Sequence, residues 1–216
     1  LVVDDVDVEY MVGELVLRRE EILARLREDG LVDRNRSLPV PPVVRRIALV
    51  TSADSDAYHD VLSSLRQANF GFEVTVFDVR VQGAELERTV RAALTLVAAH
   101  RHRFDICVIT RGGGSRVELS AWDNEAVARD VATLPVKVLI AIGHEMDRCV
   151  LDDIAHSCRT PTEAGRWLGE HIDDARRQVR SIADRIDHLA TLRVREARTR
   201  VEATVARIAA ASRQRV

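Results

Sequence analysis

Two short segments of this sequence hold the residues best suited to chemistry, and the first is rich in glycine. Residues 110–125 read TRGGGSRVELSAWDNE, which puts three glycines between Arg111 and Ser115 directly after an apolar run. Glycines let backbone N–H groups approach an anion closely, and Arg111 offers a planar fork of donors for phosphate. The segment equally suits a tight strand-to-helix turn, and it matches neither the dinucleotide-binding nor the Walker pattern.

The second segment, GHEMD at 143–147, places His144 and Asp147 three residues apart. A histidine near neutral pH can accept or release a proton, and a neighbouring carboxylate can orient it or hold a divalent cation. The alternative is a surface loop whose histidine caps the next helix. Asp60 adds a carboxylate early in an expected helix, although its spacing alone favours an exposed helical residue.

Short apolar runs that alternate with helical patterns must position these segments. Strands are expected at 47–51, 72–79, 105–110 and 136–142, and helices at 56–68, 84–101, 120–132 and 150–155. Continuous apolar strands separated by helices predict an α/β fold with a mainly parallel sheet and helices on both faces. Ligands of such sheets bind beyond the carboxyl ends of the strands, so 51–56, 111–115 and 143–147 are expected at one edge.

The flanking regions have different patterns. Residues 1–10 alternate in a strand-like way, and a helical stripe follows from about Val12 until Gly30, where a C-cap belongs. The segment DRNRSLPVPPVVRR then holds three of the five prolines and reads as an extended connector. From Glu163 to Val216 there is no proline, and apolar residues follow a heptad pattern that predicts a long coiled-coil-like helix.

Composition bounds the possible classes of protein. The 216 residues carry a formal net charge of -2, which excludes a uniformly basic nucleic-acid coat but allows a local basic groove. Three cysteines without a CxxC pair or metal-ligand spacing indicate a reducing, cytoplasmic location. No apolar stretch approaches the roughly 20 residues of a membrane span, so no membrane partner is expected.

Taken together, these segments resemble a known family, the large subunit of exodeoxyribonuclease VII. The resemblance is carried by IALVTS (47–52), HDVL (59–62), VQG (81–83), RGGGS (111–115), EL (118–119), Glu125, AIGHE (141–145) with Asp147, and TPT (160–162). It implies a nuclease that degrades single-stranded DNA to oligonucleotides from either end. The family combines an N-terminal OB-fold, a catalytic α/β domain and a C-terminal coiled coil that carries several copies of a small subunit.

On this resemblance the chain divides into four parts: a remnant strand of an upstream OB-fold (1–10), a helix with a proline-rich connector (11–44), the catalytic α/β domain (45–162) and a truncated coiled-coil helix (163–216). The implied catalytic residues are Asp60, Arg111, His144 and Asp147. Contacts to phosphate or DNA are expected from Thr51, Ser52, Gln82, Gly112, Gly113, Gly114 and Ser115. Members of the family differ in metal requirement, so no cofactor is certain. If Mg²⁺ is used, Asp60 and Asp147 are its candidate ligands.

Several positions depart from the family pattern. Ser55 and Asp56 replace small residues, Val117 replaces an acid, Ser120 replaces an aromatic residue, and Met146 stands inside the histidine segment. The family's asparagine and acid before Glu125 appear here as Asp123 and Asn124. Two alternatives therefore stay open: a catalytically weak subunit of the same fold that binds single-stranded DNA or assists assembly, and an α/β enzyme for a phosphorylated small molecule.

Overall fold

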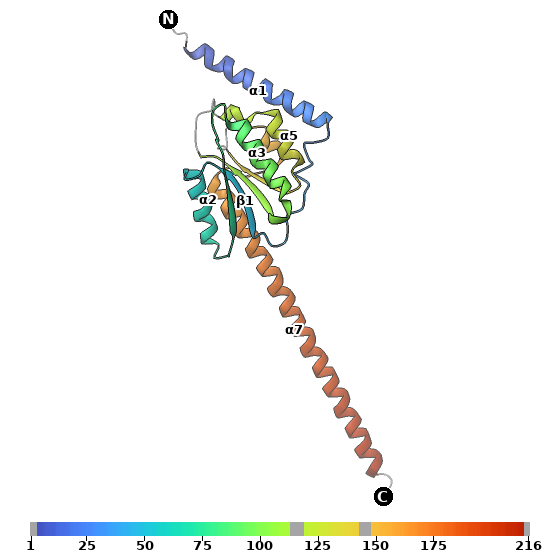
Figure 1. The fold of residues 1–216 in the computed structure, drawn as a ribbon. Helices are drawn as coiled ribbons and strands as arrows, with labels where there is room; N and C mark the ends of the chain where they lie inside the picture. Colours follow the sequence, from blue (N-terminus) through green and yellow to red (C-terminus); the bar gives the residue numbers. More distant parts are fainter. Residues whose placement is uncertain (1–3, 113–118, 143–147, 214–216) are drawn as a thin grey trace. The chain divides into compact units, whose positions relative to one another are not determined.

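The computed structural model describes residues 4–112, 119–142 and 148–213 (Figure 1). By its internal contacts the chain forms two units, Leu1–Ile172 and Asp173–Val216. The first unit contains the whole sheet and all but one of the described α-helices, and the second consists of the greater part of α7 (Pro161–Arg213). None of the described helices is both long and apolar enough to span a lipid bilayer.

A five-stranded parallel sheet forms the centre of the first unit and confirms the predicted fold class. Its strands are β1 (Arg46–Thr51), β2 (Glu73–Asp78), β3 (Ile106–Thr110), β4 (Val138–Ala141) and β5 (His156–Ser157). Their order in space is β2-β1-β3-β4-β5, and every pairing is parallel. This is an order of doubly wound sheets, in which the direction of winding reverses between β1 and β3.

The central strands are apolar along their whole length because both faces of the sheet are covered. In β1, Ala48 and Val50 belong to one core cluster while Ile47 and Leu49 belong to the other, as the two-residue period of a strand requires. The first cluster includes residues of α1 (Asp4–Glu28), α3 (Leu86–Ala99), α5 (Glu125–Thr133) and α6 (Leu151–Ile154). The second includes residues of α2 (Asp56–Gln67) and the start of α7.

The expected strands and helices are found, with two differences inside the domain. The helix expected over 120–132 is a 3-10 turn, η2 (Ser120–Trp122), followed by α5. The break occurs because Asn124 takes an extended conformation and its side chain accepts a hydrogen bond from the backbone N–H of Val127, which caps α5. The second difference is β5, which has only two residues and no signal in the sequence. A further 3-10 turn, η1 (Arg101–Arg103), follows α3.

The strand expected within residues 1–10 is wrong for the described residues, because α1 already begins at Asp4. Asp4, Asp5 and Asp7 favour the N-terminal turn of a helix, where the backbone dipole is positive, and this outweighs a short alternation of valines. Further along, Ile22, Leu23 and Leu26 of α1 are buried in the core, as the helical stripe predicted. An OB-fold upstream of the chain stays a prediction.

The start of α7 packs closely against α2, and two glycines of α7 make this close approach possible. A Cβ atom on Gly165 would lie 2.5 Å from Ser64 Cβ and 3.0 Å from the Val61 carbonyl oxygen, and one on Gly169 would lie 2.9 Å from Ala68 Cβ. Because real Cβ atoms do not approach so closely, only glycine permits this packing. Within the second unit the apolar side chains are exposed: Val179, Ile182, Ile186, Leu189, Val194, Val201, Val205 and Ile208. A coiled coil formed by this stripe stays a prediction.

Replacing Gly165 with Ala is expected to lower the free energy of unfolding by about 1–3 kcal/mol, because its methyl group overlaps Ser64 and Val61. Urea unfolding followed by circular dichroism measures the change. In a double-mutant cycle with Ser64→Gly, the second change should offset part of the loss. Gly13→Ala is the matched control, since no atom beyond its own turn of helix and chain neighbours lies within 4 Å of the place its methyl group would take, and the change favours the helix. Equal effects of the two glycine replacements would contradict this packing.

Candidate active site

Ser52, Gln82 and Arg111, which the sequence singled out, lie at the carboxyl edge of the sheet. β1, β2 and β3 all end at this edge, and β1 pairs with β2 on one side and with β3 on the other. Doubly wound sheets bind ligands where connections to neighbouring strands run to opposite faces, and here that point is between β1 and β3. The fold therefore puts the candidate site beside Thr51 and Thr110, the last residues of these two strands.

A polar pocket of about 550 Å³ opens at this point. It is formed by the segments that follow three strands, and its lining residues are Ser52, Asp54, Ser55, Asp56, Arg80, Val81, Gln82, Arg111 and Gly112. Arg80 and Arg111, from separate segments, and the two carboxylates of the segment after β1, Asp54 and Asp56, line the same space. The volume lies in the range of small-molecule sites and is large enough for one phosphate group with its neighbours.

The segment after β1 is shaped by its own side chains. The Asp78 carboxylate, at the end of β2, accepts a 2.9 Å hydrogen bond from the Ala53 N–H. The Ser55 hydroxyl accepts one from the Tyr58 N–H at 3.2 Å and so caps α2. Asp54 has a positive φ of 58°, a conformation that Asp and Asn tolerate better than most residues. The loop therefore turns sharply and directs the N-terminus of α2 to the pocket.

Arg111 is the buried cation of the pocket, with only 2% of its surface exposed. Its backbone N–H donates to the Ala141 carbonyl at 3.2 Å, and the Thr110 hydroxyl donates to the same oxygen at 2.9 Å. The next residue, Gly112, lies against the first turn of α2, where a Cβ atom on it would be 3.8 Å from the Ala57 nitrogen. A guanidinium and a helix N-terminus, both favourable to an anion, are thus brought to one place.

The structure brings together only some of the predicted site residues. Ser52, Gln82, Arg111 and Gly112 line the pocket as expected. Thr51 is fully buried and is not among the lining residues, and its hydroxyl has no hydrogen-bond partner in the described part of the chain. The remaining predicted residues, Gly113, Gly114, Ser115, His144 and Asp147, lie outside the described residues.

Asp60 is exposed on α2, one helical turn beyond Asp56, and is not part of the pocket lining. Its predicted role as a catalytic residue or Mg²⁺ ligand is therefore not supported by contact with the pocket. Within residues 4–112, 119–142 and 148–213, no three His, Cys, Asp or Glu side chains are grouped in a way that would hold a metal ion. Arg80 and Asp56, in contrast, line the pocket although the sequence had not assigned them a role in binding.

Two buried carboxylates of the first unit were missed in the sequence. Asp123 accepts a 2.7 Å hydrogen bond from the Val150 N–H, and Asp152 accepts one of 2.8 Å from the Cys149 N–H. Asp152 also accepts a 2.5 Å hydrogen bond from the Ser157 hydroxyl. No spacing rule could have found Asp123, because it lies 27 positions from Val150 and the N–H donor belongs to the backbone.

Burial raises the pKa of Asp123 to about 6, because removal from water disfavours its charged form and the neighbouring Asp152 repels it. The bond from Val150 and the charges of Arg19 and Arg18 in α1 lower that pKa and only partly offset the effect of burial. Burial, together with the charges of Asp152 and Asp123, also raises the pKa of Cys149 well above its ordinary value, so this thiol stays protonated.

The fold and the pocket together define a doubly wound α/β domain with a polar site at its switch point. A family model described as exonuclease VII, large subunit, matches residues 31–216. The chain therefore belongs to the exonuclease VII large-subunit family.

Curated relatives agree with this family. Proteins named exodeoxyribonuclease 7 large subunit are 35% identical over 191 residues in Moorella thermoacetica and 40% identical over 152 residues in Xanthomonas campestris pv. campestris strain B100. These alignments cover 88% and 69% of this chain but 47% and 34% of the relatives. One from Thermotoga petrophila is 35% identical over 158 residues, which is 73% of this chain and 39% of the relative. The chain thus spans less than half the length of each of them.

Replacing Asp123 with Asn is expected to stabilise the fold in a pH-dependent way. Because the folded pKa of about 6 lies above the unfolded value of about 3.9, the carboxyl contributes stability below pH 4 that is lost as pH rises through 6. Asn keeps an oxygen for the Val150 N–H without this loss. Asp123→Asn should therefore exceed the parent by about 1–3 kcal/mol at pH 7.5, and the difference should shrink towards pH 4.

Urea unfolding at a series of pH values between 4 and 8 measures this difference. Asp33→Asn is the matched control, because it exchanges an exposed carboxyl and should preserve the pH dependence of the parent. A benefit of Asp123→Asn that is the same at every pH would contradict the assignment.

Proposed function

We propose that this chain is the catalytic α/β domain of an exonuclease VII large subunit and hydrolyses phosphodiester bonds in single-stranded DNA, removing short products from strand ends. The observation that carries the proposal is the pocket at the switch point, where Arg111, Gly112, Gln82 and Ser52 meet beside the N-terminus of α2. These groups suit a phosphate, and the chain belongs to a family named for this activity.

Arg111 and backbone N–H groups of the glycine-rich segment hold the scissile phosphate and stabilise the charge on its oxygens as phosphorus becomes five-coordinate. A water molecule attacks phosphorus, and the bond to the leaving oxygen breaks. His144 transfers a proton, either from the attacking water or to the leaving oxygen. Asp147 orients His144 or the water. Where a divalent cation is used, Asp147 is its candidate ligand, and Asp60 contributes only if it reaches the site when DNA is bound.

The complete enzyme is proposed to act with small subunits that bind the exposed apolar stripe of the C-terminal helix. Val179, Ile186, Leu189 and their apolar neighbours leave a continuous surface that a helical partner can cover. The resemblance also implies an OB-fold that binds the strand, and the described residues contain none. We therefore expect weaker activity from residues 1–216 alone than from the complete enzyme with its small subunits, which would help to retain the DNA.

A second candidate is a catalytically weak subunit that binds single-stranded DNA. The observation that favours it is Asp56, whose carboxylate lines the same pocket as Arg111 and repels a phosphate there unless a cation intervenes. Asp56 has a structural reason for its position, since an acid in the first turn of a helix stabilises it by about 0.3–1 kcal/mol. Binding without cleavage by the complete complex would favour this candidate.

Arg111→Lys and His144→Ala, each in the full-length subunit with its small subunits, are expected to slow trimming of end-labelled single-stranded DNA. The expected loss is about 10²–10³-fold for the arginine, whose fork of donors a lysine cannot replace, and about 10²–10⁴-fold for the histidine. Duplex DNA of the same sequence should be cut little by any of the enzymes.

Arg103→Ala is the matched control, because it removes an exposed arginine at the opposite edge of the sheet and should leave trimming unaffected. Circular dichroism verifies that each variant is folded. Trimming at the parental rate by both Arg111→Lys and His144→Ala would refute the proposed site.

Trimming with and without a chelator tests the metal. If Mg²⁺ is required, we expect chelation to abolish cleavage and added Mg²⁺ to restore it, since the ion would neutralise charge on the phosphate and activate the water.

The Asp56→Ser variant separates the two candidate functions. Removal of the repelling carboxylate should tighten DNA binding at low salt, as measured by fluorescence anisotropy, and unchanged binding would remove the reason for the second candidate.

A further inference from the structure

The two arginines that line the pocket come from opposite sides of β1. Arg80 follows β2 and Arg111 follows β3, while β1 lies between these two strands in the sheet. Neighbouring strands lie about 4.8 Å apart, so about 10 Å separates the two strands that carry the arginines. Arg111 is buried, whereas Arg80 is exposed. The pocket therefore receives one cation from each side.

The segment after β1 contributes acids between these two sides. Asp54 lies in the loop and Asp56 is the first residue of α2, and both line the pocket. Across the sheet, the charge of the lining residues thus changes from positive to negative and back to positive. An anionic group is attracted by the arginine of either side and repelled by the aspartates. This order suits two anionic groups joined by an uncharged link better than one phosphate shared by both arginines.

The charge of Arg80 is not used inside the described part of the chain. None of the ion pairs between described residues includes it. Exposed arginines of the neighbouring α3 do pair, Arg88 with Glu85 and Arg91 with Glu87. The Arg80 guanidinium can therefore bind an anionic ligand without first breaking an ion pair of the described residues.

The backbone of Arg80 is fixed to both β1 and α3. Its N–H donates to the Thr89 hydroxyl of α3 at 3.0 Å, and that hydroxyl donates to the Glu85 carbonyl at 2.9 Å. The N–H of the preceding residue, Val79, donates to the Thr51 carbonyl of β1 at 3.0 Å, and Val79 is buried. The Arg80 side chain therefore starts from a fixed point at the rim of the pocket.

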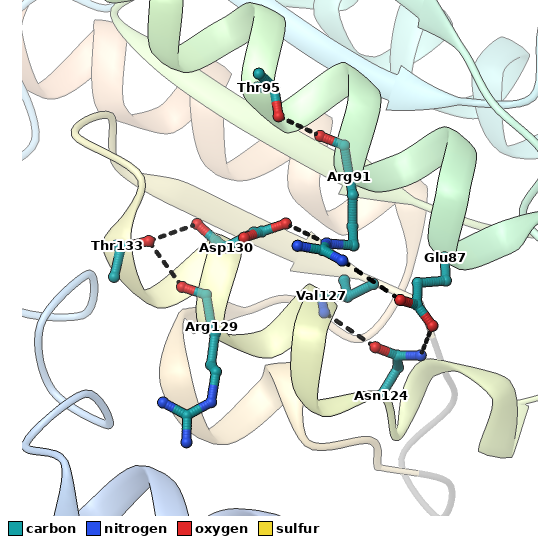
Figure 2. A network of polar contacts seen from close by, with 8 residues as sticks. All are labelled: Glu87, Arg91, Thr95, Asn124, Val127, Arg129, Asp130 and Thr133. Carbon is teal, nitrogen blue, oxygen red and sulfur yellow. Dashed lines mark hydrogen bonds and ion pairs between the residues drawn. The ribbon is translucent and has the colours of Figure 1, made fainter.

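α3, which anchors Arg80, is itself tied to α5. Arg91 of α3 bridges Glu87 of the same helix and Asp130 of α5, at 3.4 Å and 2.7 Å (Figure 2). The Asn124 amide, at the N-terminus of α5, donates to the second carboxylate oxygen of Glu87 at 2.9 Å (Figure 2). Because this frame is already ordered, only the Arg80 side chain loses freedom when it binds a ligand, and that keeps the entropic cost of binding small.

We propose that Arg80 binds a second phosphate of the DNA strand, the neighbour of the phosphate held by Arg111. The uncharged sugar between the two phosphates then lies across the segment after β1. Arg80 thereby favours polynucleotides over small molecules with a single phosphate, which leave its side of the pocket without an anion. It is a binding residue and takes no part in bond breaking. This inference rests on the proposed function, because it assigns Arg80 to the same site.

The test compares the parent with Arg80→Gln, each as the full-length subunit with its small subunits, and follows cleavage of end-labelled single-stranded DNA at one chosen bond. In a series of substrates, each phosphodiester in turn is replaced by an uncharged methylphosphonate. On fully charged DNA, kcat/KM of Arg80→Gln should be about 10- to 100-fold below that of the parent, because a charge-assisted hydrogen bond is lost.

The methylphosphonate series then identifies the phosphate that Arg80 binds. In the parent, replacement of one linkage beside the cleaved bond should lower kcat/KM by a similar factor. In Arg80→Gln the same replacement should lower it less than about twofold, since the cation that recognises this phosphate is already absent. The slope of log kcat/KM against log salt should also decrease by about 0.7, the value for one phosphate contact to a single strand.

Arg66→Gln is the matched control. It removes an exposed arginine in the last turn of α2, about 15 Å along the helix from Asp56, and should preserve both the parental kcat/KM and the parental methylphosphonate pattern. Arg80→Lys keeps the charge without the fork of donors and should recover part of the loss. Circular dichroism verifies that each variant is folded. Parental kcat/KM in Arg80→Gln, or methylphosphonate losses that equal those of the parent at every linkage, would overturn the proposal.

Failure of this inference is distinguishable from failure of the proposed function. A parent enzyme that does not trim single-stranded DNA would refute the function itself. A parent that trims, an Arg111→Lys variant that does not, and an Arg80→Gln variant that trims at the parental rate would refute the role of Arg80 alone.

Discussion

The parallel pairing of β1 with β3 is the constraint on which the rest of this structure depends. Residues 47–50 pair with 106–109, although more than fifty residues separate the two strands in sequence. The intervening chain must form β2 on the outer side of β1, while the chain after β3 continues to β4 on the other side. The connections that follow β1 and β3 therefore diverge at the carboxyl ends of these two strands. The space between them becomes the pocket, and the first residues after each strand become its walls.

The sheet was predictable because its central strands are buried on both faces and are therefore apolar throughout. In β1 and β3 such runs are short and rich in β-branched residues, a pattern that favours a buried strand over a helix. Where the prediction failed, the deciding interaction was small or distant. The side chain of Asn124 is enough to interrupt a helical pattern, and β5 consists of two residues that need β4 as a template. At the N-terminus, the alternating valines suggested a strand, but the neighbouring acids favour the start of a helix, and the structure has a helix there.

The candidate site divides in the same way between what local sequence determines and what tertiary structure adds. Arg111, Gly112 and Ser52 could be assigned because each closely follows a predicted strand, and parallel strands end at a common edge. Asp60 could not be placed by this rule, since it lies inside a helix, where rotation by one residue decides between pocket and solvent. Asp123 and Asp152 were not predictable at all. Their partners include backbone N–H groups, which carry no signature in the sequence, and burial rather than residue type distinguishes them from other acids.

The exchanged order of Asp123 and Asn124 illustrates how the structure weighs a departure from a family pattern. Both positions require an oxygen that accepts a backbone hydrogen bond, from Val150 at one and from Val127 at the other. An amide and a carboxylate both supply one, so exchanging them preserves both bonds and moves a charge into a buried site. Arg19 and Arg18 partly offset that charge. The departure thus affects stability and its pH dependence rather than the geometry of the site. Asp56 is different, because its charge faces the pocket that a phosphate would occupy, and there the geometry is preserved while the electrostatics are changed.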